Sequence, residues 1–273
     1  MLKISFCALI TCAVSFLAYG QEHYGPGLKE RGSQEASCHY DGDEFVLDGV
    51  LDVAAYRCFR DTFVSGTKRI RVSSTGGQAS IGLGLSKLLQ DEDFHLTVEG
   101  SCNSACALYI LPIASELTVL KNSSIILHGS VSKAQLSQSH LNLVAASYRE
   151  KGYSKEQIEK EVETYKALVE LVIHDTSKLR EERNIGAGWF MVSNTWMEDE
   201  DRLVTIAAED WLRDNETFGV FVSPAFIKSC LPELIINQYY GPEDAIYKND
   251  KKFQDHISRA KASIRPDAKC IRS

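Results

Sequence analysis

The sequence predicts a layered α/β fold built on a largely parallel sheet, and three observations indicate it. Short apolar segments with strand character alternate with helical segments between residues 44 and 128. Polar or glycine-rich breaks follow several of these strands. The chain has 273 residues, of which 44% are hydrophobic, so it can enclose a large core without help from a metal. Right-handed crossovers would then bring the loops after the strands to one edge of the sheet.

The alternation can be followed element by element. The expected strands, in order, are residues 45–47, 70–72, 94–98, 117–120 and 124–127. The expected helices are residues 51–63, 81–89 and 104–113, the second of them marked by Ile81, Leu85 and Leu89 at helical spacing. Two breaks separate strand from helix: Ser74–Gly77, and a turn expected at residues 100–103.

A different pattern covers residues 134–182, which are expected to be helical. Ser154 and Gln157 form the start of a capping box. Apolar residues then recur at intervals of four, three, four and three, which marks one buried stripe of a long helix. This stripe consists of Ile158, Val162, Tyr165, Val169 and Val172. A helix packed on the domain explains it better than a cofactor or partner site, so we place a helical insertion within a domain of residues 38–222, followed by a C-terminal extension of residues 223–273.

The first 20 residues have the pattern of a signal peptide. Lys3 supplies a positive charge, residues 4–17 are apolar, and Ala18-Tyr19-Gly20 resembles a cleavage site. The apolar run is short for a membrane span, although an uncleaved anchor is the alternative. Residues 21–37 are polar and glycine-rich and are expected to form a flexible lead-in. The sequence therefore predicts a periplasmic or secreted protein with no further membrane span.

Cysteine usage agrees with export. Of eight cysteines, Cys7 and Cys12 lie in the predicted signal peptide, which leaves six in the mature chain. Six cysteines permit 15 pairings, and the local pairing is our prediction. It joins Cys38 to Cys58, Cys102 to Cys106, and Cys230 to Cys270. A metal or redox site at Cys102 and Cys106 is the alternative, but no CxxC motif or nearby His or Cys cluster supports a metal.

Charge excludes one class of partner. The formal net charge is −7, and no block of Lys and Arg occurs. Nucleic acid is therefore not an expected partner. Neither a cofactor nor a metal is expected.

Ser104 is the strongest candidate for chemistry. It is expected to follow a strand and a tight turn and to begin a helix, where free backbone N–H groups can stabilise the anion that forms when a nucleophile attacks a carbonyl. Gly76 and Gly77 also follow a strand and could supply a second N–H, although a glycine pair is more often only a tight turn. His128 ends a strand and could act as general base, with a structural histidine as the alternative. The other candidates, His95, His140 and His174, are weaker because they lie within a strand or in the helical stretch.

These motifs occur in a recognisable order: strand, S-T-G-G, helix; strand, G-S-C-N-S-A-C, helix; strand, I-I-L-H-G. The order resembles the Clp protease proteolytic subunit and its crotonase-fold relatives. It is closer to periplasmic Clp-protease-like proteins, which carry a Ser inside a C-x-S-A-C segment, as at residues 102–106. The resemblance covers residues 44–130 well and residues 185–222 loosely. It implies a layered fold of repeated β-β-α units, to which the helical segment and the C-terminal extension are added.

The resemblance also implies roles for particular residues. Ser104 would be the nucleophile, His128 the general base, and the N–H groups of Gly77 and Ala105 the oxyanion hole. A disulfide between Cys102 and Cys106 would brace the turn at Ser104. The acidic member of the triad matches less well. It would be one of Glu198, Asp199, Glu200 and Asp201, and we choose Asp199.

The function so implied is that of an exported serine hydrolase, most simply a peptidase, that forms an acyl-enzyme on Ser104. Its partner would be a peptide or another acyl substrate, and rings or trimers of the chain would be possible. A binding or scaffold protein that has kept the fold without the activity is the alternative. An acyl-coenzyme-A enzyme, a third possibility, is disfavoured because an exported protein seldom meets that cofactor.

Overall fold

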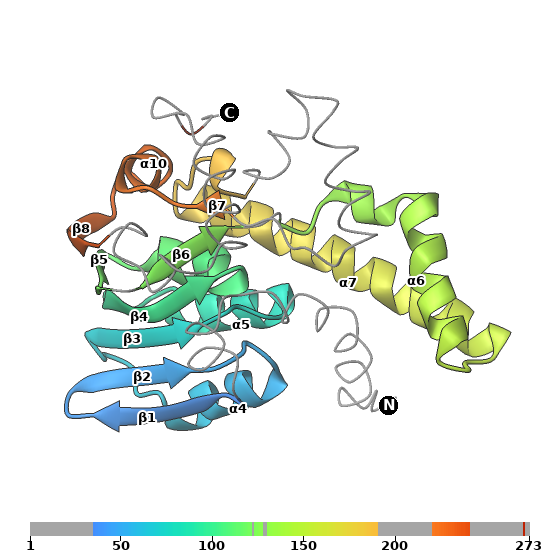
Figure 1. Ribbon diagram of the computed structural model, residues 1–273, viewed down its shortest axis with the longest axis horizontal. Helices are drawn as coiled ribbons and strands as arrows, with labels where there is room; N and C mark the ends of the chain where they lie inside the picture. Colours follow the sequence, from blue (N-terminus) through green and yellow to red (C-terminus); the bar gives the residue numbers. More distant parts are fainter. Residues whose placement is uncertain (1–34, 122, 128–129, 191–219, 241–269, 271–273) are drawn as a thin grey trace, which may run out of the picture.

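The computed structural model describes residues 35–121, 123–127, 130–190, 220–240 and 270. Within these residues, eight strands form one sheet (Figure 1). The strands are β1 (Ser37–Asp41), β2 (Glu44–Asp48), β3 (Arg69–Ser74), β4 (His95–Asn103), β5 (Glu116–Val119), β6 (Ser124–Leu127), β7 (Val220–Phe221) and β8 (Ile235–Tyr239). The sheet order is β1-β2-β3-β4-β5-β8, with β6 paired to β4 and β7 paired to β6.

Most of the strand pairs are parallel. The exceptions among the described strands are β1 against β2 and β7 against β6, which are antiparallel. The β2–β3, β3–β4, β4–β5, β4–β6 and β5–β8 pairs are all parallel. The prediction of an α/β fold with a largely parallel sheet is therefore confirmed.

Strand β4 branches the sheet. Its first half, from His95 to Val98, pairs with β5, and its second half, from Ser101 to Asn103, pairs with β6. The turn predicted at residues 100–103 is therefore wrong, since these residues continue the strand. Gly100 has a φ of 91°, and this backbone conformation, open mainly to glycine, lies between the two halves of the strand. The turn signal came from Gly100, but the pairing with β6 kept the next three residues extended.

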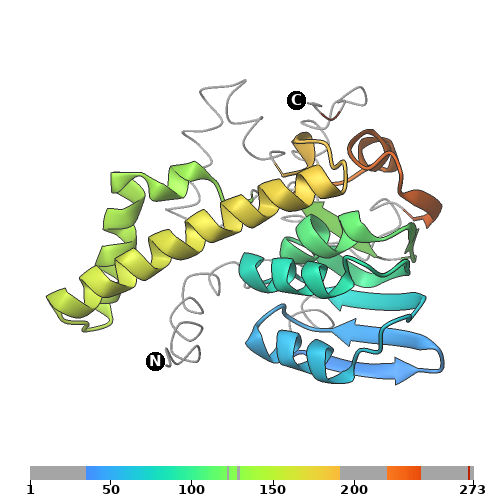
Figure 2. The same ribbon diagram turned by 180° about the vertical axis from the view of Figure 1, so that it is seen from behind.

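Two helices cover one face of the sheet (Figure 2). They are α4 (Val53–Thr62), which starts where the side chain of Asp52 accepts a hydrogen bond from the N–H of Ala55, and α5 (Ala79–Leu89). Both were predicted within a few residues. Their apolar sides pack on residues from β2, β3 and β4 in one large hydrophobic core.

The other face of the sheet is charged. Arg71 of β3 lies 2.7 Å from Asp41 of β1, 3.0 Å from Glu44 of β2 and 2.9 Å from Glu99 of β4. Alternation along each strand explains the contrast, because successive side chains point to opposite faces. Val46 of β2, opposite Arg71, is buried among these charged side chains.

The predicted helical segment consists of the short 3-10 turn Lys133–Leu136, then α6 (Gln138–Glu150) and α7 (Lys155–Glu182). Ser154 and Gln157 form the predicted capping box at the start of α7. The two helices extend beyond the sheet in both views (Figures 1 and 2). They enclose a small separate core of Val144, Tyr148 and Ile158, while Val172 and Leu179, further along α7, join the main core.

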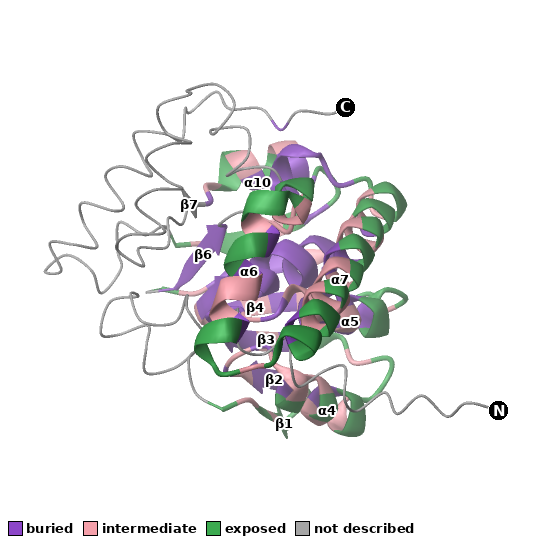
Figure 3. Cartoon of the chain, turned by 90° about the vertical axis from the view of Figure 1, so that its right-hand side faces the viewer, coloured by how far each residue is buried: buried purple, intermediate pink, exposed green. Residues whose placement is uncertain are grey.

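Part of the predicted C-terminal extension belongs to the same body. Helix α10 (Pro224–Cys230) buries Ile227, and β8 adds to the edge of the sheet beside β5. Leu231 and Leu234 lie in the main core. The chain between Ser223 and Tyr239 is therefore integrated into the α/β domain. In Figure 3 the purple, buried residues gather in the sheet and its covering helices.

All three predicted disulfides are confirmed. They join Cys38 to Cys58, Cys102 to Cys106, and Cys230 to Cys270. No helix in the described part of the chain is long and apolar enough to span a membrane. The predicted signal peptide, residues 1–20, lies outside the described residues, as does the lead-in up to residue 34.

Candidate functional site

Ser104 lies at a sharp turn between β4 and the helical segment that follows. Its φ is 52°, in the left-handed region that side-chain-bearing residues seldom adopt. Its N–H donates to the carbonyl of Ile126 in β6 at 2.8 Å, and its own carbonyl accepts from Leu108 at 2.8 Å. Its exposed fraction is 8%, so only a small part of the residue reaches the surface. Ser104 is thus fixed on both sides in a conformation that costs about 1 kcal/mol.

The segment after Ser104 is not the regular helix predicted for residues 104–113. It is a π-helix over Cys106–Ile110, followed by a 3-10 turn over Leu111–Ile113. Pro112 explains the change, because it has no N–H to donate and disturbs the regular ladder of hydrogen bonds. The N–H of Leu111 bonds instead to the carbonyl of Cys106, one residue further back than in an α-helix.

A disulfide spans the turn at Ser104. Cys102 is in β4, Cys106 begins the π-helix, and their Cα atoms lie 5.1 Å apart. Both residues are 0% exposed. The strand and the helical segment are therefore joined covalently across the candidate nucleophile.

Gly76 lies directly against this turn. Its φ is 95°, and a methyl group placed on it would come within 2.5 Å of Ser104 Cβ and of the carbonyl oxygen of Asn103. The same methyl group would be 3.1 Å from the N atom of Ala105. The absence of a side chain at Gly76 is what lets the loop after β3 approach Ser104 so closely.

Gly77 is held differently. It forms a parallel bridge with Leu51, and a side chain on it would collide with the backbone of Leu51. The flanking bonds run from Leu51 N–H to the Gly76 carbonyl and from Gln78 N–H to the Leu51 carbonyl. Both glycines of the pair are therefore required by close backbone approach, Gly76 toward Ser104 and Gly77 toward Leu51.

Two backbone donors near the turn have no acceptor. Within the described ranges, neither the N–H of Gly77 nor that of Ala105 donates a hydrogen bond. These are the two groups expected to form an oxyanion hole. The N–H of Gly76, in contrast, donates to Ser74 Oγ at 3.1 Å.

The ends of three parallel strands meet at this site. Ser74 of β3 is opposite Cys102 of β4, and Asn103 of β4 is opposite Ile126 of β6. The described part of β6 ends at Leu127, one residue before His128 in the sequence. His128 and Asp199, the expected base and acid, lie outside the described residues.

Sequence reasoning missed a group of buried polar side chains at the same edge. Ser73, Ser101 and Asn103 each have a side-chain atom without a hydrogen-bond partner among the described residues, and none is more than 3% exposed. The side-chain oxygen Oδ1 of Asn103 accepts a hydrogen bond from Ser124 Oγ at 3.5 Å. The side-chain nitrogen Nδ2 of Asn103 has no acceptor among the described residues. Single polar residues inside a strand carry no pattern that would distinguish them from solvent-facing ones, so only the pairing of β4 with β3 and β6 placed them at one edge of the sheet.

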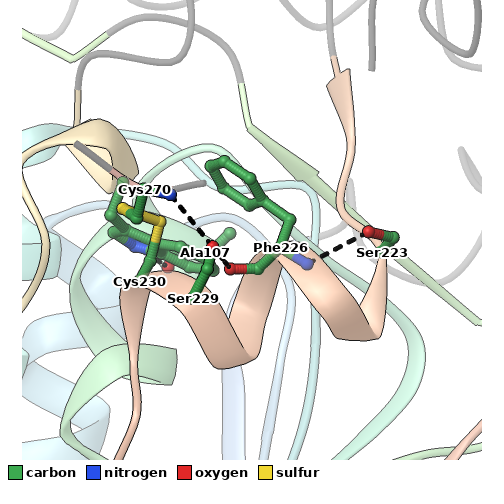
Figure 4. Close-up of a disulfide and its surroundings, with 7 residues drawn as sticks. Ala107, Ser223, Phe226, Ser229, Cys230 and Cys270 are labelled. Atoms are coloured by element: carbon green, nitrogen blue, oxygen red, sulfur yellow. Dashed lines mark hydrogen bonds between the residues drawn. A yellow bond between two sulfur atoms is a disulfide. The ribbon is translucent and has the colours of Figure 1, made fainter. Parts of the chain in front are cut away.

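The π-helix after Ser104 is also supported from its far side. Trp189 is 0% exposed, and its indole Nε1–H donates to the carbonyl of Ala107 at 3.2 Å. That carbonyl has no partner five residues on, since position 112 is proline. Figure 4 shows Ala107 next to the Cys230–Cys270 disulfide and Phe226 of α10. Ser229 Oγ accepts from the N–H of Cys270 at 3.1 Å, which further fixes the disulfide.

Two of the remaining histidine candidates, His95 and His140, have structural partners. His95 Nε2 contacts Thr118 Oγ1 at 2.8 Å, and His140 Nε2 contacts the Tyr165 hydroxyl at 2.9 Å. Burial lowers the pKa of His140 and raises the pKa of Tyr165 to about 12. Both members of the His140–Tyr165 pair lie in the helical hairpin and not at the strand ends. No group of three or more His, Cys, Asp or Glu side chains within the described ranges could hold a metal ion.

Comparison with known proteins adds no family assignment. No protein-family model matches the chain, and no curated protein matches it significantly.

Proposed function

We propose that this protein is an exported serine hydrolase of the Clp-protease-like type, most simply a peptidase, and that Ser104 forms the acyl-enzyme. The observation that carries the proposal is the turn at Ser104, where a residue with a left-handed backbone stands between a strand and a helical segment. A serine held in this way presents its hydroxyl apart from the regular hydrogen bonding of either element. Strained backbone of this kind is concentrated at functional sites.

Two further features support the proposal. The N–H groups of Gly77 and Ala105, which donate to no group among the described residues, fit the role of oxyanion donors, because an acyl oxygen gains negative charge when Ser104 attacks. Three disulfides fit an oxidising compartment outside the cytoplasm. The described topology, with β4 shared between β5 and β6, is compatible with the layered crotonase-like architecture to which the motif order is similar.

In the proposed reaction, His128 takes the Ser104 proton as Oγ attacks the acyl carbon. The tetrahedral oxyanion is stabilised by the N–H groups of Gly77 and Ala105, and His128 then returns the proton to the leaving group. Water then attacks the acyl carbon of the acyl-enzyme while His128 takes its proton. His128 returns a proton to Ser104 Oγ as the bond between Oγ and the acyl carbon breaks, which releases the acid and restores the enzyme. Asp199 would orient His128.

A fluorophosphonate probe tests this function. The purified mature protein is expected to be labelled on Ser104, and Ser104→Ala is expected to abolish the labelling. Ser101→Ala is a matched control, since Ser101 is a buried serine of β4 whose Oγ has no partner in the described part of the chain. A folded wild-type protein that is not labelled, or a Ser104→Ala protein that still is, would exclude the hydrolase and leave a binding or scaffold protein as the function.

A further inference from the structure

The Cys102–Cys106 disulfide has a location that a purely stabilising cross-link does not require. It closes the shortest loop of the three disulfides, with a sequence separation of 4 compared with 20 and 40. Cross-links that close short loops remove the least conformational entropy from the unfolded chain. This disulfide is therefore expected to contribute least to stability, and its position across the turn calls for another explanation.

The turn itself needs a constraint. A serine relaxes readily from a φ of 52° to the β or right-handed helical region. Either relaxation would change how residues 102 and 106 lie relative to each other. Extension of β4 would lengthen the distance between them, and an earlier helix start would change the direction from one to the other. The disulfide keeps the Cα atoms of Cys102 and Cys106 5.1 Å apart, so the chain between them has little room for either change.

Both ends of the cross-link are fixed in the core. Cys102 is paired in the sheet with Ser74 on one side and Ile125 on the other. Cys106 begins the π-helix, whose five residues are all buried. The two sulfur-bearing residues are 0% exposed, so a reductant in solution does not reach them in the folded protein. The cross-link is accordingly a permanent brace and not an exposed redox switch.

We infer that the Cys102–Cys106 disulfide is a positioning element for Ser104: it holds the left-handed turn that presents the hydroxyl and keeps the Ala105 N–H beside Gly76. This inference rests on the proposed function for its effect on reactivity, whereas its effect on the backbone is independent of it. Gly76 and the Ser104–Ile126 hydrogen bond act on the same turn from the sheet side.

Two readouts on paired variants test the inference. Cys102→Ala/Cys106→Ala removes the brace, and Cys38→Ala/Cys58→Ala removes a disulfide that lies between β1 and α4. Amide hydrogen exchange of residues 103–111 is expected to accelerate at least tenfold in the first variant and to stay unchanged in the second. The rate of fluorophosphonate labelling is expected to fall at least tenfold in the first variant only, even though the second variant loses more thermal stability.

The outcomes separate the two proposals. Unchanged exchange over residues 103–111 in the Cys102→Ala/Cys106→Ala variant would overturn the positioning role, whatever the probe does. Absence of labelling in the wild-type protein would refute the hydrolase, while the exchange measurement would still decide whether the disulfide holds the turn.

A second measurement needs no variant and covers the case in which the double substitution prevents folding. Cys102, Ser104 and Cys106 lie in one tryptic peptide, residues 88–121. Wild-type protein is partly reduced in dilute urea, transferred to buffer, treated with the probe and then alkylated. We expect the probe on peptides that retain the disulfide. On peptides alkylated at both cysteines, the fraction that carries the probe is expected to be at least tenfold lower. Equal probe yield on the two forms would overturn the inference.

Discussion

Gly76 lies so close to Ser104 that a methyl group on the glycine would be 2.5 Å from the serine Cβ. This contact joins the loop after β3 to the turn after β4, and both loops leave the sheet at its carboxyl edge. The relationship explains why a glycine pair and a serine 27 residues further along the chain belong to one site.

Gly76→Ala is predicted to disrupt this contact. The new methyl group would overlap with Ser104 Cβ and the Asn103 carbonyl, and the residue would also retain an unfavourable φ of 95°. Overpacking and the backbone term together are expected to cost about 3 kcal/mol of unfolding free energy. Chemical denaturation measures the loss, and labelling of Ser104 is expected to fall with it.

Gly66→Ala is the matched control for Gly76→Ala. Gly66 has a similar φ of 89°, but nothing lies within 4 Å of a methyl group placed there. Its expected cost is therefore only about 1 kcal/mol. Equal losses in the two variants would show that backbone conformation, and not the contact with Ser104, determines the requirement for glycine at position 76.

The three disulfides are predicted to differ in their contribution to stability. Paired Cys→Ala substitutions are expected to cost about 2, about 3 and about 4 kcal/mol for sequence separations of 4, 20 and 40, because longer loops lose more entropy when closed. The order is Cys102–Cys106, Cys38–Cys58, Cys230–Cys270. Urea denaturation of the three double variants checks it. A larger loss for Cys102–Cys106 than for Cys230–Cys270 would contradict it.

Trp189→Phe is predicted to destabilise the π-helix from its far side. Phenylalanine retains an aromatic ring beside Phe226 but has no N–H, so the Ala107 carbonyl loses its donor. The expected cost is about 2 kcal/mol, part from the hydrogen bond and part from the smaller ring. Phe226→Leu is the control, since it removes the ring partner and leaves the indole donor. Denaturation and hydrogen exchange of residues 107–112 report the two effects, and unchanged exchange in Trp189→Phe would contradict the role of the indole.

The His140–Tyr165 pair predicts a pH dependence. Burial lowers the pKa of His140 below its ordinary value of 6.5, so the unfolded chain binds a proton more readily than the folded protein. Stability is therefore complete above about pH 6.5 and decreases as the pH falls toward the folded-state pKa. Thermal melting between pH 7.5 and pH 5 is expected to show a larger loss for wild type than for His140→Gln. If the melting temperatures of wild type and His140→Gln changed with pH in the same way, His140 would not be the source of the pH dependence.

Much of this arrangement was predictable because it depends on local sequence. Short apolar segments at residues 45–47, 70–72 and 124–127 indicated buried strands. The capping box at Ser154 indicated the start of α7. The local pairing predicted for the six cysteines is the pairing that the structure shows. The sequence placed Ser104 after a strand and a turn, whereas the structure places it directly after β4.

The sequence by itself thus determined the α/β class, because periodicity is a property of neighbouring residues. It indicated the local cysteine pairing and Ser104 as the candidate nucleophile without deciding either. Only the tertiary structure decided that residues 100–103 continue β4, since Ser101 pairs with Ser124 of β6, which is far away in the chain. It also decided that Gly76, and not Gly77, touches Ser104, and that β8 completes the edge beside β5. These relationships depend on contacts between distant segments, which no local pattern encodes.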